Sequence, residues 1–338
     1  MQNWIAMKWM TLWKRHRSKN LINPGDQMFC LGSCFAEHVG QFLQDKKCSI
    51  LQNPGGIMYN PITICRNATK WLNGGATDSR IIKWEEIYHS LDHHGEMSGL
   101  SEKELKGNIM IADNLANDIM RTAKFGIITF GSAWVYRWKE DGKIVANCHK
   151  IPADKFEKEI LSKEEIVDQW SDLLRVWKMA NPEIKVILTV SPVRHIRDGL
   201  VENQRSKATL VLAVSELVDR FDYVEYFPSY EIMIDELREY RFYTEDLVHP
   251  NSMAVEYVMS TFSACYFSSE MDRMSKELKS LRRSLEHRPF FPQTNSYRAH
   301  LEKTQHKLNG MIKECPGLDW LNEDRKIAAL WDQAMRST

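Results

Sequence analysis

Four short apolar runs alternate with long segments of helical hydrophobic spacing, and this alternation constrains the fold more than any other feature of the chain. The apolar runs of strand length are residues 27–31, 125–130, 185–190 and 223–227. The segments with helical spacing are residues 35–43, 163–179, 203–220 and 252–267. Strands that alternate with helices predict a mostly parallel sheet with helices on both faces. We therefore expect an α/β fold, built as a three-layer α/β/α sandwich of the flavodoxin-like type.

Length and charge limit the number of domains and the kinds of partner. The chain has 338 residues, enough for one large α/β domain and an appendage. Its 45 Lys and Arg residues balance 45 Asp and Glu residues, so the formal net charge is zero. Without a basic excess, neither nucleic acid nor an anionic membrane is an expected partner. A hydrophobic content of 43% is ordinary for a globular protein and argues against disorder.

The last part of the chain changes character from Glu270 onward, where charged residues are frequent and apolar positions are sparse. The pattern predicts an amphipathic helix, a turn broken by prolines at residues 288–292, and two further helices. We expect an α/β domain over residues 20–267 and a helical C-terminal extension over residues 268–338. The extension is interpreted as a cap, as a contact for a homo-oligomer, or as a solvated tail packed on the core. Within the α/β domain, residues 66–120 are interpreted as an insertion of helices and loops.

Cysteine usage and the N-terminal pattern bear on the compartment. The seven cysteines show neither a Cys-x-x-Cys pair nor regular spacing, which favours a reducing compartment over a disulfide framework. The apolar residues 1–13 precede the basic residues Lys14, Arg15 and Arg17, which is the reverse of a secretory signal. No apolar run reaches the length of about 18 residues that a membrane span needs. We therefore expect a cytoplasmic chain with no membrane partner.

Two side-chain nucleophiles, Ser33 and Cys34, follow Gly32 where the first predicted strand meets the first predicted helix. In open parallel sheets the site lies beyond the carboxyl ends of the strands. Gly131 and Ser191 each begin a turn after a later strand, so these turns should converge with the first one on a single crevice. The backbone N–H groups at the helix start can stabilise a developing oxyanion there.

Far downstream, Asp246 and His249 provide an acid and a base three residues apart. As a general base, His249 would take a proton from the nucleophile, and Asp246 would orient its ring and stabilise the imidazolium. A nucleophile early in the chain and Asp-x-x-His late is the order of Ser/Cys-His-Asp hydrolases of the flavodoxin-like, lipase type. The sequence therefore predicts acyl-transfer chemistry.

The block at residues 31–36, Leu-Gly-Ser-Cys-Phe-Ala, resembles the name-giving block of the GSCFA-domain family, a branch of the SGNH (GDSL-like) hydrolase superfamily. Four further blocks fit that family's pattern in order, at residues 53–61, 130–136, 189–195 and 246–251. The resemblance covers roughly residues 20–265 and implies an SGNH-type fold. It implies an esterase or acyltransferase that acts on a small-molecule or glycan ester, with carbohydrate esters favoured, and that needs no cofactor.

The identity of the nucleophile stays open by one position. Laid without a gap on the superfamily pattern, the Gly-Ser-Cys sequence puts Cys34 at the nucleophile and Ser33 at the usual Asp position, whereas a shift of one restores Ser33. A helix N-terminus and a nearby His lower a thiol pKa, which suits Cys34, while a serine depends more on the His base. The alternatives are a small core residue for Cys34 and a helix N-cap for Ser33.

The resemblance also implies where the oxyanion donors lie. They would be the N–H of the nucleophile, the N–H of Gly56 or its neighbour Gly55, and an Asn side chain from the third block. Here the third block begins at Gly131 and contains no Asn, and losing one donor costs roughly 3 kcal/mol of transition-state stabilisation. Ser132 and Asn147 are the candidates to replace it, and capping or turn roles are their alternatives.

Three histidines, His89, His93 and His94, invite comparison with a helical zinc pair, because the first two are four residues apart. No Glu follows His89 and helix signals are weak there, so we expect no metal. Ser90 and His94 are interpreted either as substrate-loop residues or as surface residues.

Arg194 and His195 follow the third strand and should border the crevice, where they would bind a carboxylate or sugar hydroxyls unless they only build a turn. Trp134, Tyr136 and Trp138 alternate with other residues and fit either an aromatic wall for a sugar or core packing. Two other functions stay open at this point. One is a catalytically silent carbohydrate-binding domain, suggested by the missing Asn, and the other is a cysteine-peptidase-like enzyme.

Overall fold

A five-stranded sheet forms the centre of the computed structural model, which describes residues 11–75 and 79–336. The strands are β1 (Gln27–Gly32), β2 (Ser49–Gln52), β6 (Phe125–Phe130), β9 (Lys185–Val190) and β10 (Val224–Phe227). Their order is β10-β9-β6-β1-β2, and the pairs β1–β6, β6–β9 and β9–β10 are parallel. All four predicted apolar runs are therefore strands of one sheet, and the ends of β1, β6 and β9 lie along one edge of it.

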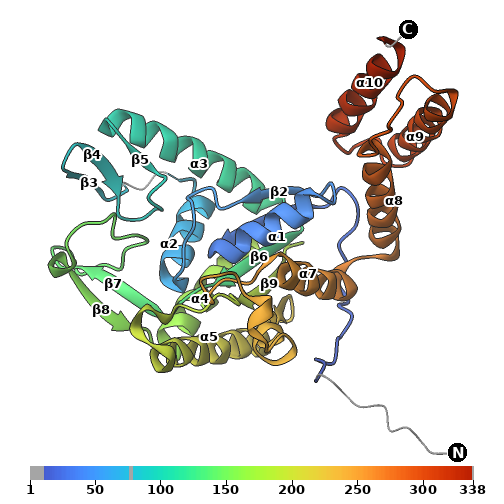
Figure 1. Cartoon of the computed structure of the whole chain (residues 1–338). Coiled ribbons are helices and arrows are strands. Elements are labelled where there is room, and N and C mark those ends of the chain that lie inside the picture. The colour runs from blue at the N-terminus through green and yellow to red at the C-terminus, as the bar shows by residue number, and fades with distance from the viewer. Residues whose placement is uncertain (1–10, 76–78, 337–338) are drawn as a thin grey trace, which may run out of the picture. The chain divides into compact units, whose positions relative to one another are not determined.

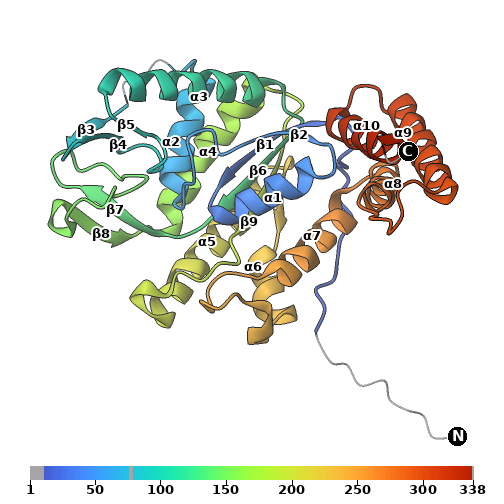
Figure 2. The same ribbon diagram turned by 45° about the horizontal axis from the view of Figure 1, so that its top comes forward.

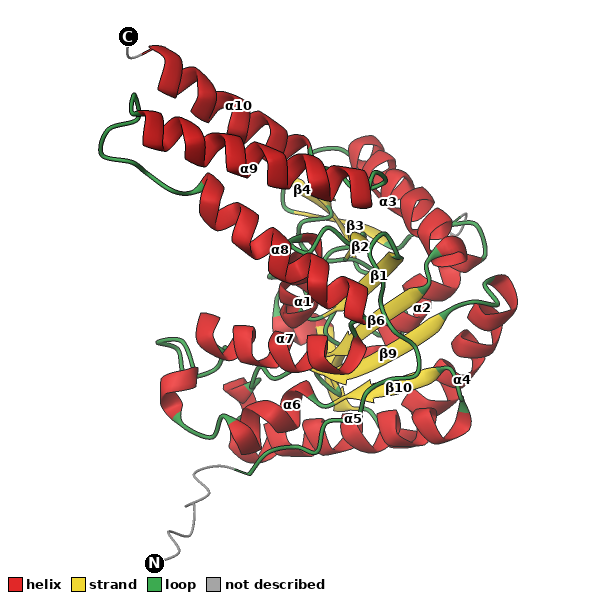
Figure 3. Cartoon of the chain, turned by 90° about the vertical axis from the view of Figure 1, so that its right-hand side faces the viewer, coloured by secondary structure: helices red, strands yellow, loops and turns green. Residues whose placement is uncertain are grey.

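Helices cover both faces of this sheet and give the three-layer α/β/α sandwich predicted from the sequence (Figure 1). One face carries α2 (Pro61–Leu72), α3 (Glu102–Thr122), α4 (Lys163–Ala180) and α5 (Leu200–Arg220). Their buried Trp71, Trp170 and Trp177 pack with Phe29 of β1 in one continuous core. The other face carries α1 (Cys34–Gln44) and α7 (Ser252–Tyr266). Figure 3 shows α7 across the sheet from α4.

Three short strands, β3 (Ile81–Trp84), β4 (Ile87–Ser90) and β5 (Ser98–Gly99), form a separate antiparallel sheet before α3 (Figure 2). The sequence pattern predicts only helices and loops over residues 66–120, so these strands correct that interpretation. The strands have four, four and two residues, which is too short for an alternating apolar pattern to stand out.

Two antiparallel strands, β7 (Trp134–Trp138) and β8 (Phe156–Ile160), follow β6. The three alternating aromatic residues all lie on β7, but their surroundings differ. Trp138 is buried against Phe156 in a small satellite core. Trp134 and Tyr136 are half-buried and lie 4.9 and 5.7 Å from the ammonium nitrogen of Lys158. One of the three therefore packs in a core, and the other two stand under a lysine at the surface.

Short helical turns complete the α/β unit. They are α6 (Ser229–Glu231), a π-helical turn at Ile232–Glu236, and 3-10 turns at Ala153–Lys155, Ile196–Asp198 and Tyr240–Phe242. The last of these leads into the loop that carries Asp246 and His249.

The chain divides into two compact units, and the smaller one is mainly helical. It joins residues 17–26 and 43–49 to the chain from Ser263 onward, which contains α8 (Ser269–Leu285), α9 (Asn295–Glu314) and α10 (Leu321–Arg336). Ile22 and Phe267 form a parallel β-bridge, and Lys47 pairs with Glu323 at 2.5 Å. The three helices predicted for this region are thus present, and early segments of the chain belong with them. In the part of the chain that the structure describes, no helix has both the length and the hydrophobicity of a membrane span.

Candidate active site

The turn after β1 is held in one conformation by neighbouring segments. Gly32 has a φ of +134°, and a Cβ built there would lie 2.1 Å from the backbone oxygen of Thr129. The Gly32 N–H donates to Asn53 Oδ1 at 2.9 Å, and the Gly32 carbonyl accepts the N–H of Met58 at 2.9 Å. Only glycine fits this position without strain, so the fold fixes the turn that precedes both candidate nucleophiles.

Ser33 lies beneath this turn. Its side chain is fully buried, and its N–H donates to the carbonyl of Thr129 at 3.1 Å. A Cβ on Gly131 would come within 3.2 Å of Ser33 Cβ, so the turn after β6 packs directly against the serine. The buried hydroxyl meets no hydrogen-bond partner among the described residues. Ser33 therefore lies packed between two strand-end turns.

Cys34 is the first residue of α1 and is half-buried. Burial, together with the neighbouring Glu37, raises the pKa of the Cys34 thiol above its ordinary value. The opposing effects of Lys207 and of the backbone N–H groups of Phe35 and Cys34 on this pKa are smaller, so the lowering expected from the helix start is not observed. The sulfur thus lies at the positive end of a helix and within the field of a buried cation. Of the two candidate nucleophiles, Cys34 has the more accessible side chain.

A buried lysine ties the ends of β6 and β9 together. Lys207 on α5 is 1% exposed, and its Nζ donates to the carbonyls of Gly131 at 2.8 Å and of Ser191 at 2.7 Å. Burial lowers the pKa of Lys207 to about 7, against an opposing effect of Cys34. The cation thus connects two of the turns that were expected to converge, and it lies near the thiol at the third. Sequence analysis missed this residue.

Asp246 contacts the ring of His249 directly. His249 Nδ1 and Asp246 Oδ2 are 2.6 Å apart, which leaves Nε2 as the nitrogen for proton transfer. Hydrogen bonds from the Thr244 hydroxyl and from the backbone N–H groups of His249 and Val248 hold the pKa of Asp246 well below its usual range. The carboxylate stays ionised and can support an imidazolium. The two side chains are 47% and 49% exposed, so the pair stands at the surface.

His249 and Cys34 each affect the pKa values of neighbouring side chains. Burial and the charge of His249 lower the pKa of His38, which lies four residues after Cys34 on α1. Burial is the main cause that lowers the pKa of His195 to about 3, and His249 contributes to it. The His195 ring meets the Tyr59 ring edge-on at 5.4 Å between centroids, and burial and Cys34 raise the pKa of Tyr59. The segment that carries His249 therefore lies near α1 and near the loop after β9.

The predicted oxyanion donors form local hydrogen bonds. The Gly56 N–H donates to the carbonyl three residues earlier at 2.8 Å, and the Gly131 N–H donates to the carbonyl of Tyr59 at 2.8 Å. Ser132 Oγ and Asn147 Oδ1 each accept the backbone N–H two residues further along, at 3.0 and 2.7 Å. These bonds are turn contacts of the kind that the sequence left open as alternatives. The part of these residues in oxyanion binding stays a prediction.

The histidine-rich segment is a buried polar cluster next to the site. Ser90 Oγ lies 2.7 Å from His93 Nδ1, and the carbonyl of Ser90 lies 2.8 Å from His149 Nε2. Burial lowers the pKa of both His93 and His149 to about 4, so both rings are neutral near pH 7. His89 stacks on His149 from strand β4, not from a helix, and His94 is half-buried. Among the described residues, no three or more His, Cys, Asp or Glu side chains gather as metal ligands would.

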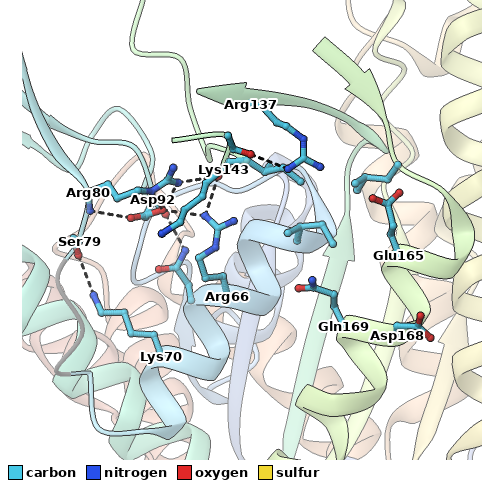
Figure 4. Close-up of a pocket in the computed structure, with 15 residues that line it drawn as sticks. Arg66, Lys70, Ser79, Arg80, Asp92, Arg137, Lys143, Glu165, Asp168 and Gln169 are labelled. Atoms are coloured by element: carbon cyan, nitrogen blue, oxygen red, sulfur yellow. Dashed lines mark hydrogen bonds and ion pairs between the residues drawn. The ribbon is translucent and has the colours of Figure 1, made fainter. Parts of the chain in front are cut away.

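A pocket of about 720 Å³ opens between α2, α4 and the loop after β7 (Figure 4). Arginines and lysines line one side of it, but its arginines are bonded to carboxylates. Arg66 and Arg80 both bind Asp92, at 3.1 and 2.5 Å. Arg137 binds Glu159 at 2.5 Å. These ion pairs give the arginines of this pocket a structural role.

The fold and the site together define a class: an α/β sandwich whose first strand delivers a candidate nucleophile to the start of a helix. Residues 27–262 match the model of the GSCFA family, so the chain belongs to that family. Residues 278–331 match a second model, described as GSCFA domain protein, C-terminal domain. The family resemblance inferred from the sequence blocks is thereby confirmed.

Solved structures show only distant likeness. A proposed platelet activating factor from Streptococcus pneumonia has 12% identity, a TM-score of 0.39, and coverage of 72% of this chain and 84% of its own. A carbohydrate esterase family 3 protein from Talaromyces cellulolyticus has 9% identity, a TM-score of 0.35, and coverage of 75% and 99%. An acetyl xylan esterase from Butyrivibrio proteoclasticus has 9% identity, a TM-score of 0.36, and coverage of 77% and 66%. At such TM-scores these similarities support no conclusion about the function of this chain. No curated protein matches the chain.

Proposed function

We propose that the protein is an esterase-type acyl hydrolase in which Cys34 is the nucleophile, His249 the general base and Asp246 the residue that orients it. The observation that carries this proposal is the Asp246–His249 contact of 2.6 Å, on a loop whose histidine lies near His38 of α1, the helix that begins at the partly buried Cys34. Ser33 is fully buried, which favours the cysteine. The early nucleophile and late Asp-x-x-His order supports the same assignment.

In this mechanism His249 Nε2 takes the proton of the Cys34 thiol, and the thiolate attacks the ester carbonyl. The C–O bond to the alcohol breaks, His249 returns the proton to the leaving oxygen, and a thioester to Cys34 remains. Water, activated by His249, then attacks the thioester, which releases a carboxylic acid and restores the thiol. Backbone N–H groups at the start of α1 support the oxyanion that develops in both steps.

The proposed substrate class is an O-acyl ester of a carbohydrate, which rests on the family resemblance. A hydroxyl acceptor in place of water would make the same site an acyltransferase, because the second step differs only in the attacking oxygen. A catalytically silent binding domain is the second candidate, favoured by the absence of an Asn from the third block at residues 130–136.

The test compares Cys34→Ala with Ser33→Ala on turnover of an aryl acetate and of acetylated methyl glucoside. We expect Cys34→Ala to remove turnover and Ser33→Ala to leave most of it in protein that still folds. Iodoacetamide should inactivate the wild type as one thiol is lost, and peptide mapping should find the label on Cys34. Unchanged turnover in both variants would rule out this site, and no turnover by the wild type would leave the binding domain ahead.

A further inference from the structure

A second pocket, of about 330 Å³, opens between the loop after β9, the start of α5 and the segment that leads to His249. Its volume lies at the small end of the range for ligand sites and suits one ring-sized group. The residues that bear on its chemistry are Arg194, Gln204, Tyr230, Arg238, Tyr240 and Tyr243.

The charge of this pocket differs from that of the larger pocket in Figure 4. It is lined by two arginines and by no acidic residue. In the part of the chain that the structure describes, neither Arg194 nor Arg238 has a carboxylate partner, and Arg194 Nε is buried without a hydrogen-bond partner. In the larger pocket, by contrast, Arg66 and Arg80 share Asp92. Guanidinium groups that line a pocket without a carboxylate partner are most simply neutralised by an anion.

Aromatic rings form the walls beside these cations. The guanidinium of Arg194 lies 4.6 Å from the ring centroid of Tyr243 and 5.7 Å from that of Tyr240, and the Tyr240 side chain is 63% exposed. The Tyr230 hydroxyl donates to Gln204 Oε1. Ring faces pack well on the apolar C–H face of a pyranose, while the polar groups at their edges bind hydroxyls.

Arg194 also links the pocket to the proposed base. Its backbone N–H donates to the carbonyl of Val248 at 3.3 Å, and its guanidinium Nη2 donates to the carbonyl of Leu247. These are the two residues directly before His249. A group held by Arg194 would therefore lie next to the loop that carries out proton transfer.

We infer that this pocket binds a carboxylate-bearing sugar ring, so that the ester substrate carries a uronate next to the scissile bond. A guanidinium group matches the planar, bidentate geometry of a carboxylate, the pocket is lined by two of them, and the tyrosines hold the ring. The inference deepens the proposed function and rests on it for the position of the scissile ester.

The binding test uses Cys34→Ala protein, in which turnover is blocked, and ligand-observed NMR titrations with sodium glucuronate, glucose and glucose 6-phosphate. We expect glucuronate to bind about tenfold more tightly than glucose, as a charge-assisted hydrogen bond would give. Arg238→Met and Arg194→Lys should each reduce this preference. Arg241→Met is the matched control, because Arg241 lies nearby but pairs with Glu239 at 3.0 Å, and it should keep the preference.

Equal binding of glucuronate and glucose would overturn the inference, and so would tighter binding of glucose 6-phosphate or an equal loss in Arg241→Met. A second arm compares kcat/KM of the wild type on acetylated methyl glucuronoside and acetylated methyl glucoside. Selective binding without turnover of either ester would reject the proposed esterase while the pocket stands. Turnover of both esters without selective binding would reject the pocket while the esterase stands.

Discussion

The two halves of the proposed site are built in different ways. The turn after β1 is packed into the sheet: Ser33 is fully buried, and the backbone at Gly32 is bonded to Asn53 and Met58 from another loop. The Asp246 and His249 side chains are about half exposed, and among the described residues the hydrogen bonds to the Asp246 carboxylate come from Thr244, Val248 and His249. One half is therefore part of the core, and the other is a surface loop whose carboxylate is held by its own residues.

This difference teaches that stability and activity should separate between the two halves. A change in the turn disturbs contacts between strands, so it should destabilise the whole α/β unit. A change in the loop disturbs only local bonds, so it should leave the fold intact and affect chemistry alone.

The largest expected effect is on activity, from His249→Gln in the exposed loop. Loss of the general base should lower kcat for the aryl acetate by about a thousandfold, or roughly 4 kcal/mol of transition-state stabilisation. The free energy of unfolding in urea should change by less than about 0.5 kcal/mol, because the side chain is exposed. If His249→Gln lowered the free energy of unfolding as strongly as it lowered the transition-state stabilisation, the comparison between the two halves would be wrong.

The next effect is on stability, from Gly32→Ala in the buried turn. The added Cβ would meet the Thr129 oxygen at 2.1 Å in a backbone conformation with a φ of +134°, so unfolding should become easier by about 3 kcal/mol. The control is Gly142→Ala, which has a φ of +67° and no atom within 4 Å of the new Cβ. It should cost only about 1 kcal/mol in the same urea titration. Equal losses in both variants would show that the turn is not packed as described.

The smallest effect concerns the buried His93, whose ring lies 3.1 Å from the Cβ position of Gly55 behind the turn. Burial lowers its pKa from 6.5 to about 4. Between pH 6.5 and 4, His93 therefore binds a proton in the unfolded chain but not in the folded chain. The free energy of unfolding falls as the pH drops through this range. His93→Gln should reduce this slope by about 1.4 kcal/mol per pH unit, measured by urea unfolding across that window. A slope that His93→Gln leaves unchanged would contradict the burial of this ring.

Much of the sheet could be predicted because its strands are long and apolar. The runs at 27–31, 125–130 and 185–190 could hardly be anything but buried strands, and the helices between them showed regular spacing. The strands β3 to β5 could not be predicted, since they are short and pair only with one another.

The site could be predicted from the sequence only in part, because some of its contacts depend on how distant segments meet. Lys207 occupies the stripe of α5 that continues to Leu210, Val214 and Leu217, and a lysine at such a position is a readable signal of a buried, bonded cation. Which carbonyls it binds depends on how β6 and β9 end beside each other, and no local pattern encodes that. Likewise, the burial of Ser33 rather than Cys34 depends on α1 beginning at Cys34, and the local sequence does not fix that first residue.

The bridge between Ile22 and Phe267 has a consequence for biosynthesis. Ile22 is synthesised before every strand of the central sheet, whereas the segment that accepts and donates its backbone hydrogen bonds is synthesised after all of them. Residues 17–26 can therefore form these bonds only after the strands of the sheet have been synthesised. Because the smaller unit joins early and late segments of the chain, it closes after the sheet has been made.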